Sequence, residues 1–297
     1  MTVDLPDAEL KRLAILIRIS IVKMIAQAKS GHIGGALGLA DIYAVLYKEI
    51  LSVRPFQPDW SDRDFLLVSN GHTCPVWYAT LAQMGFFPKT WLSKFRQLNS
   101  PLQGHPHFFP AYTDDAGTTH YPVPGVENTS GSLGQGLSQA TGLALGLKKQ
   151  GRPNKVYCFL SDAEHEEGQV WEAYMLGKQY QLTNLTPIID LNQIQISGNT
   201  GQIMAVNPLA PKLKAFGWDV WEVDGHNYQE LAQVFKHLRT EPRQPTAIIA
   251  KTVAGKGVSF MENNFVWHGN LPNLDQARQA IDELTAQLDA LGEESHV

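Results

Sequence analysis

Apolar residues recur at spacings of three and four along the N-terminal segment, the pattern of a helix with one buried face. Between Asp7 and Ala28 they are Leu10, Leu13, Ile17, Ile21 and Met24. A glycine-rich loop follows from Gly31 to Gly38, and a second helix is predicted from Leu39 to Leu51. Such a loop delivers free backbone N–H groups to a helix N-terminus, which suits an anion.

Short apolar runs farther along predict strands that alternate with helices. The predicted strands are 65–69, 156–160, 187–191, 219–223 and 246–250, and the predicted helices between them include 76–84, 168–182 and 228–238. This alternation predicts an α/β fold with a doubly wound, mostly parallel sheet and helices on both faces. No repeat or linker interrupts the series, so we expect a single domain over residues 1–297.

Three further segments carry expectations of their own. Residues 99–128 are rich in Pro, Gly, His and Tyr without periodicity, which favours a functional loop. A helix after Gly136 is expected to pack closely on the sheet through small residues, namely Ser138, Ala140, Gly142, Ala144 and Gly146. The C-terminal helix is expected to pack on this domain, and not in a coiled coil, through Leu274, Ala277, Ile281, Leu284, Leu288 and Leu291.

Composition excludes several classes of function. The chain has 297 residues, 43% of them hydrophobic and 18% charged, which is typical of a soluble globular protein. Its net charge of -5, without a Lys/Arg block, argues against nucleic acid binding. The stretch Leu13 to Ile25 is too short and too charged to span a membrane, and no signal-peptide cleavage site follows it. Cys74 and Cys158 offer no disulfide framework, so a reducing cytoplasm is expected.

Polar residues follow two of the predicted strands. Asp162 comes after the strand 156–160, and Asn192 after the strand 187–191. Adjacent parallel strands would bring both side chains to the same carboxyl edge of the sheet. A carboxylate, an amide oxygen and a backbone carbonyl leave room for two phosphate oxygens and water around Mg²⁺. The pair therefore predicts a magnesium diphosphate site, although either residue taken singly would more often be a helix cap or a turn residue.

The stretch 161–173, Ser-Asp-Ala-Glu-x-x-Glu-Gly-x-x-Trp-Glu-Ala, followed by Asp-x-Asn at 190–192, resembles the thiamine diphosphate motif of transketolases. The family form usually begins Gly-Asp-Gly, so Ser161 and Ala163 depart from it. If the second glycine had a positive φ, Ala163 would strain the backbone there. Further blocks match the family in the same order: Ser30–Gly35, Ser69–His72, Gly104–Pro106, Gly125–Glu127, Gly131–Gly136, Asp224–His226 and Trp267–Gly269.

The resemblance implies the fold and activity of a transketolase, which transfers a two-carbon ketol unit from a ketose (phosphate) to an aldose (phosphate). In that family thiamine diphosphate supplies the carbon nucleophile, and the protein orients the reactants and moves protons. Mg²⁺, or Ca²⁺ or Mn²⁺ in its place, would be held by Asp162, Asn192 and the Ile194 carbonyl.

The resemblance also assigns roles to other residues. The residues implied to contact the cofactor are His72, Gly131, Leu133, Asp162, Ala163 through its N–H, Glu167, Asn192 and His268, with Glu167 in a network between subunits. The implied catalytic histidines are His32, His105 and His268 on the substrate side and His72 near the diphosphate. The histidines that match no functional position, and are expected to be structural, are His107, His120, His165 and His237. The segment Lys251–Gly257 lacks the spacing of a P-loop and is expected to lie over the cofactor.

Full-length transketolases continue into a pyrimidine-binding domain and a C-terminal domain that this sequence lacks. The resemblance therefore implies a partner chain with those domains, an α₂β₂ assembly, and no turnover without the partner. The orderly C-terminal helix favours a separate gene over truncation. Two alternatives stay open: the α subunit of a 2-oxoacid dehydrogenase, against which the histidine blocks argue, and a non-catalytic transketolase-like paralogue, which Ser161 and Ala163 would favour.

Overall fold

A five-stranded parallel sheet lies at the centre of the computed structural model, which describes residues 7–240 and 243–294. Its order is β1-β4-β5-β9-β8, and every neighbouring pair is parallel. The strands are β1 (Phe65–Val68), β4 (Val156–Ser161), β5 (Leu185–Leu191), β8 (Asp219–Asp224) and β9 (Thr246–Lys251). All five predicted strands are confirmed, with ends that differ by at most two residues.

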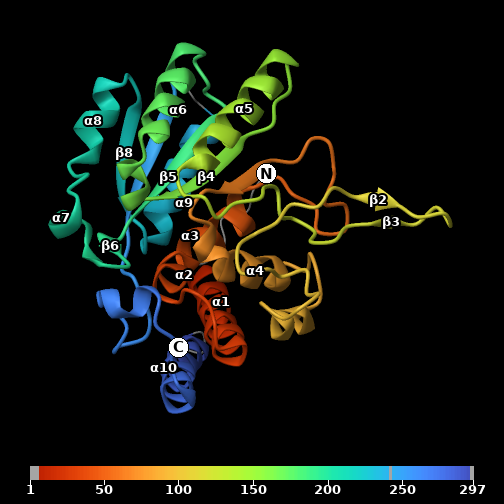
Figure 1. Cartoon of the computed structure of the whole chain (residues 1–297), viewed down its shortest axis with the longest axis vertical. Helices are drawn as coiled ribbons and strands as arrows, with labels where there is room; N and C mark the ends of the chain where they lie inside the picture. Colours follow the sequence, from red (N-terminus) through yellow and green to blue (C-terminus); the bar gives the residue numbers. More distant parts are fainter. Residues whose placement is uncertain (1–6, 241–242, 295–297) are drawn as a thin grey trace.

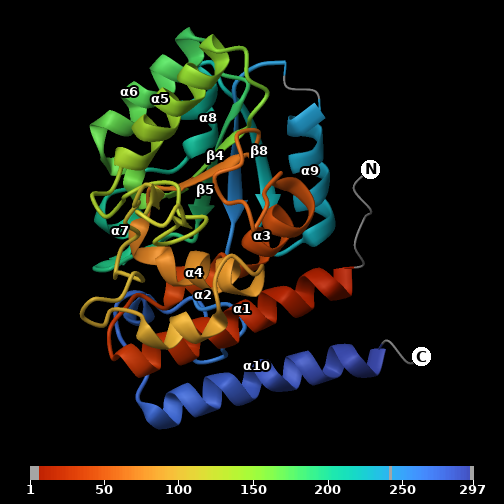
Figure 2. The ribbon, with the colours of Figure 1, turned by 90° about the vertical axis from the view of Figure 1, so that its right-hand side faces the viewer.

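Helices cover both faces of the sheet (Figures 1 and 2). One face carries α5 (Gln135–Lys149), α6 (Gly168–Gln179) and α8 (Leu209–Ala215). The opposite side of the molecule carries α1 (Asp7–Ala28), α3 (Ala40–Val45), α4 (Cys74–Gln83) and α9 (Tyr228–Thr240). Each side has its own cluster of buried apolar side chains, so the doubly wound α/β prediction is confirmed. The C-terminal helix α10 (Leu274–Glu294) lies along α1, as Figure 2 shows, and so packs on this chain as expected. Leu274, which was expected on the packed face, is 70% exposed because it is the first residue of the helix.

The glycine-rich loop at residues 31–38 is more helical than predicted. Instead of one helix from 39 to 51, the chain forms α2 (Gly34–Gly38), then α3, then a π-helical turn at Leu46–Ile50. A Cβ at Gly34 would lie 3.0 Å from the Trp267 carbonyl oxygen, and one at Gly38 would lie 2.9 Å from the Val253 carbonyl oxygen. These glycines therefore allow α2 to pack directly on the backbone of two distant loops.

Helix α5 packs on the sheet through a different face from the one predicted. Ala140 and Ala144 are buried, but Ser138 and Gly142 are exposed. A Cβ at Gly142 or Gly146 would meet nothing within 4 Å. The prediction was wrong because it used small residues at alternate positions. A helix with 3.6 residues per turn cannot bury alternate positions on one side.

Residues 99–128 form an extended segment that contains a small hairpin, β2 (Tyr112–Thr113) and β3 (Thr119–His120). The hairpin projects from the body of the molecule (Figure 1). The short elements around the sheet edge are the 3₁₀ turns Gly71–Thr73, Ala163–Glu166 and Phe265–His268, the hairpin β6 (Ile194–Gln195) and β7 (Gly198–Asn199), and α7 (Thr200–Ile203). A further 3₁₀ turn, Lys89–Lys94, packs on α1 and α4. Within the described residues, no helix is long and apolar enough to cross a membrane.

Candidate active site

The carboxyl ends of β4 and β5 lie side by side, since Ser161 is paired with Asp190 in the parallel register. Asp162 and the turn that contains Asn192 follow directly. The outer carboxylate oxygen of Asp162, Oδ2, accepts hydrogen bonds from the Gln193 N–H at 2.9 Å and the Thr200 hydroxyl at 3.3 Å. The structure thus brings together the two strand ends that the sequence singled out.

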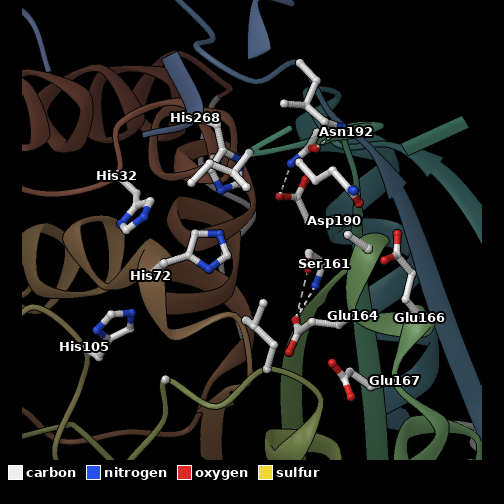
Figure 3. A pocket seen from close by; sticks show the side chains of 17 residues that line it. His32, His72, His105, Ser161, Glu164, Glu166, Glu167, Asp190, Asn192 and His268 are labelled. Carbon is white, nitrogen blue, oxygen red and sulfur yellow. Dashed lines mark hydrogen bonds between the residues drawn. The ribbon is translucent and has the colours of Figure 1, made fainter. Parts of the chain in front are cut away.

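These strand ends form one wall of a cavity of about 370 Å³ (Figure 3). The opposite wall carries four histidines from four separate segments: His32, His72, His105 and His268. Their rings are close neighbours, with centroids 5.3 Å apart for His32 and His72 and 5.2 Å apart for His72 and His268. Of the residues predicted for the site, those that line this cavity are His32, His72, His105, Gly131, Leu133, Ala163, Glu167, Asn192, Ile194 and His268. Asp162 is fully buried behind its wall.

The environment of the four histidines favours their uncharged form, because it lowers the pKa of each ring. Burial lowers the pKa of His32 to about 4, and the neighbouring His268, Arg96 and His105 contribute to the lowering. The pKa values of His72, His105 and His268 are also lowered, in each case mainly by burial. A neutral imidazole offers one donor and one acceptor, so these rings can bind both hydroxyl and carbonyl groups of a sugar.

The wall formed by the strand ends, called the acidic wall below, has carboxyl groups whose pKa values are raised. Burial raises the pKa of Asp162 to about 6, and hydrogen bonds from the Ala163 and Gln193 N–H groups oppose it. Burial likewise raises the pKa of Asp190 to about 7, and the nearby Asp162 contributes to the rise. Buried carboxyl groups with raised pKa values would be stabilised as anions by a divalent cation.

The chemistry of the donors fits a hard cation such as Mg²⁺. In the described part of the chain no group of three or more His, Cys, Asp or Glu side chains could hold a metal ion. A metal at this edge would therefore depend on one carboxylate, an amide oxygen, a backbone carbonyl and oxygens brought by a diphosphate, which is the set predicted from the sequence. The residues present are compatible with that arrangement.

Ala163, one of the two departures from the family motif, sits in an ordinary backbone conformation. It begins the 3₁₀ turn Ala163–Glu166 and has no positive φ. Its N–H, predicted to bind the diphosphate, donates to Asp162 Oδ1 at 2.9 Å in this structure. Alanine therefore causes no strain here, and the N–H is close to the strand end where a phosphate would lie.

Two carboxyl groups of the site were not singled out from the sequence. Glu164 is fully buried and accepts hydrogen bonds from the Ser69 hydroxyl at 2.5 Å and the Gly134 N–H at 2.8 Å. It also accepts the Ser161 N–H at 2.7 Å and the Ser161 hydroxyl at 3.2 Å. Glu164 thereby joins the ends of β1 and β4 to the N-terminus of α5. The hydroxyl of Ser161, the other departure from the motif, is part of this network.

Asp190, the second of these carboxyl groups, orients the amide of Asn192. It accepts a hydrogen bond from Asn192 Nδ2 at 2.7 Å and another from the Thr252 hydroxyl at the end of β9. The nitrogen of the amide is thus fixed toward Asp190, and the oxygen is turned the other way, toward the Ile194 N–H at 2.9 Å. The sequence feature that could have indicated this role was an acidic residue at the second-last position of an apolar strand.

The four histidines that were expected to be structural do not line the cavity. His165 is buried against Tyr174, at 3.1 Å from its hydroxyl, and His120 pairs with Asp114 in the hairpin. The ring of His237 lies tilted against Trp221, with centroids 5.4 Å apart, and His107 lies against Phe109. The segment Lys251–Gly257 also differs from expectation: it does not line the cavity, and its Gly255 N–H instead donates to the Gly34 carbonyl at 2.8 Å. This segment therefore packs against the first residue of α2.

Comparison with known proteins decides the family. Residues 10–288 match the family described as transketolase, thiamine diphosphate binding domain. The chain belongs to the transketolase family. One relative is a subunit of the apulose-4-phosphate transketolase of Phocaeicola vulgatus, 34% identical over 276 residues, covering 93% of this chain and 94% of that protein. Another is a 6-deoxy-6-sulfo-D-fructose transketolase subunit of Clostridium sp. strain MSTE9, also 34% identical over 276 residues, covering 93% and 96%.

Full-length transketolases match only in part of their length. The chain is 36% identical over 280 residues to rat transketolase, and the match covers 94% of the chain and 42% of the rat protein. The structure of transketolase from Leishmania mexicana superposes with a TM-score of 0.80 at 29% identity, covering 96% of this chain and 46% of that one. The thiamine diphosphate-binding fold is thereby confirmed, as is the prediction of an N-terminal, cofactor-binding subunit of a split transketolase. The chain spans less than half the length of these full-length relatives.

Proposed function

We propose that the chain is the diphosphate-binding subunit of a two-subunit transketolase that transfers a two-carbon ketol unit from a ketose phosphate to an aldose phosphate. The observation that carries this proposal is a single cavity in which four uncharged histidines face the ends of β4 and β5. The hydroxyl and carbonyl oxygens of a ketose can bind to the histidine wall. A diphosphate with its cation suits the wall formed by the strand ends. On this proposal the whole chain is one such domain.

The acidic wall would hold the cofactor. Thiamine diphosphate, when bound, supplies the carbon nucleophile that attacks a ketose carbonyl. Asp162, the Asn192 oxygen and the Ile194 carbonyl would hold Mg²⁺, while the Ala163 N–H would turn from Asp162 to a phosphate oxygen. Gly131, Leu133, His72 and His268, which line the same cavity, would flank the cofactor.

The histidine wall would bind and orient the sugar. His32, His105 and His268 project into the cavity from three different loops, so they can contact successive oxygens of one substrate (Figure 3). The Nδ1 atom of His32 is buried without a hydrogen-bond partner among the described residues, which leaves it available to a substrate oxygen. Because their pKa values are lowered, these rings are neutral at neutral pH, so each can accept a hydrogen bond from a hydroxyl through one nitrogen and donate one to a carbonyl or alkoxide oxygen through the other.

A partner chain would complete the site. Exposed apolar side chains line the cavity, where Leu133 is 39% exposed and Ile196 67%. Phe265, which begins the turn that carries His268, is 43% exposed. Glu167 is exposed on the same rim, where a contact between subunits would reach it. The relatives named as subunits support a partner that carries the pyrimidine-binding and C-terminal domains. A two-fold α₂β₂ assembly would follow, because each such site lies at an interface. We also propose a location in the reducing cytoplasm, in keeping with the two free cysteines.

The relatives also suggest a class of substrate. The name of the Phocaeicola protein contains a sugar phosphate, and that of the Clostridium protein contains a sugar sulfonate. An anionic ketose is therefore the donor that we propose for this chain as well.

The test is to purify the chain with and without its partner and to measure ketol transfer with saturating Mg²⁺ and thiamine diphosphate. The assembled enzyme should be active and the chain alone inactive. Substantial turnover by the chain alone would refute the split site. Oxidation of a 2-oxoacid instead of ketol transfer would favour a dehydrogenase α subunit, and failure to bind the cofactor in calorimetry would favour a non-catalytic paralogue.

A further inference from the structure

The guanidinium of Arg96 connects the two loops that carry His32 and His105. Its Nη1 donates to the Ser30 hydroxyl at 2.7 Å, and its Nη2 donates to the Gly104 carbonyl at 3.1 Å. Ser30 is two residues before His32, and Gly104 is directly before His105. One planar group therefore bonds to the Ser30 side chain before His32 and to the Gly104 backbone before His105, two histidines that lie 73 residues apart in sequence, 105 minus 32.

The backbone at Gly104 and at Arg96 allows the guanidinium to approach closely. The guanidinium lies against Gly104 so closely that a Cβ there would be 2.6 Å from Arg96 Cζ. Arg96 itself has a φ of 57°, an uncommon conformation for an arginine, and its N–H is held by the Leu102 carbonyl at 2.9 Å. Residues in uncommon backbone conformations cluster at functional sites, and Arg96 contacts the two loops whose histidines line the cavity.

The charge of Arg96 is not used in an ion pair. Among the residues that the structure describes, its side chain bonds to a hydroxyl and a carbonyl, and no carboxylate is paired with it. The positive charge lowers the pKa values of both His32 and His105, after the larger effect of burial. The titratable groups that face these two rings and the Gly104 loop are Arg96, His72, His268 and Cys74.

We propose that Arg96 is a positioning residue for ketol transfer, which sets the separation of His32 and His105 by tying Ser30 to Gly104. The inference rests on the proposed function of the two histidines as substrate-binding groups. If the two loops moved independently, the rings could not meet neighbouring oxygens of one sugar at the same time. Errors of about 1 Å in such positioning cost roughly 100-fold in rate. The positive charge of Arg96 adds to the effect of burial, which lowers the pKa values of both rings.

Four variants separate the tether from the charge. Arg96→Gln removes the charge and the tether between the two loops. Arg96→Lys keeps the charge, but an ammonium group lacks the planar fork with which a guanidinium binds two acceptors at once. Ser30→Ala removes one end of the tether. Arg278→Ala, an exposed arginine of α10, is the matched control. The readouts are the histidine ring pKa values by NMR in the full chain, thiamine diphosphate affinity, and kcat and KM of the complex with the partner.

The proposal predicts different results for each variant. In Arg96→Gln the pKa values of His32 and His105 rise and kcat falls about 10- to 100-fold. In Arg96→Lys the two pKa values stay low, yet kcat falls by a similar factor. Cofactor affinity stays within about threefold in both, because the proposed ligands of the metal and the diphosphate lie at the ends of β4 and β5 and not on the two loops that Arg96 joins. Ser30→Ala lowers kcat less, and it adds no further loss to Arg96→Lys because that tether is already broken.

Two results would overturn the proposal: kcat for Arg96→Lys within about twofold of the Arg278→Ala control, or cofactor affinity lost in parallel with kcat. If Arg96→Gln does not fold, Arg96→Lys and Ser30→Ala decide the question. The NMR readout separates this inference from the proposed function. An inactive wild-type complex whose histidine pKa values still rise in Arg96→Gln would refute the function and retain the electrostatic link, whereas an active complex unaffected by these substitutions would refute the role of Arg96.

Discussion

Gly136 packs directly on Ser69. The Gly136 N–H donates to the Ser69 hydroxyl at 3.1 Å, and a Cβ at Gly136 would lie 2.5 Å from Ser69 Cα. The first turn of α5 is thereby fixed to the end of β1, beside the cavity. Since Ser69 also donates to Glu164, this contact belongs to the network that holds three elements around the site.

Substitution by alanine should have opposite effects at two glycines of α5. Gly136→Ala should lower the free energy of unfolding by about 1–3 kcal/mol, because the added methyl group overlaps Ser69. Gly142→Ala should raise it by about 0.5–1 kcal/mol, because that position is exposed and helical and has open space around it. Urea denaturation of the two variants measures this, and equal effects would show that the contact with Ser69 is unimportant.

Asp162→Asn should weaken the joint binding of Mg²⁺ and thiamine diphosphate by about 100-fold or more, because it replaces the charged oxygen ligand proposed for the cation. Titration calorimetry on the complex with the partner provides the measurement. Asp282→Asn, at an exposed position of α10, is the control. Unchanged affinity in Asp162→Asn would remove this residue from the metal site.

His105→Ala should lower ketol transfer far more than it lowers cofactor affinity, by about 100-fold against less than threefold. The reason is its place on the histidine wall, across the cavity from the strand ends. His107→Ala, two residues farther on and exposed, should leave both quantities unchanged. Parallel losses of rate and affinity in His105→Ala would show that this ring serves the cofactor instead of the sugar.

Acid should destabilise the protein because buried histidines must take up protons. Burial lowers the pKa of His165 from 6.5 to about 4, so the folded state binds fewer protons than the unfolded chain in this interval. The stability that His165 contributes is complete above pH 6.5 and is lost as the pH falls through 6.5 toward 4. Melting temperatures should therefore fall more steeply over this range in the wild type than in His165→Gln. His237→Gln, at an exposed position, should keep the wild-type slope.

The fold could be predicted from local patterns. The period of apolar residues identified α1 and all five strands of the sheet, because burial on one or both sides of an element leaves its spacing in the sequence. The same patterns failed where packing partners were remote. The glycines of α2 looked like a flexible loop, and their contacts with the Trp267 and Val253 carbonyls lie more than 200 residues away.

The motifs determined which residues gather at the cavity, since parallel strands end at one edge and the histidine blocks follow a known order. What only the tertiary structure decided is how those residues are held. Asp190 fixes the amide of Asn192, Glu164 joins two strands to α5, and Arg96 joins the loops of two histidines. Each of these contacts depends on the direction in which side chains from distant segments meet. The spacing of apolar residues along a chain indicates which side of an element is buried. It does not determine which hydrogen-bond partner a buried polar group will have, because that partner comes from a distant segment.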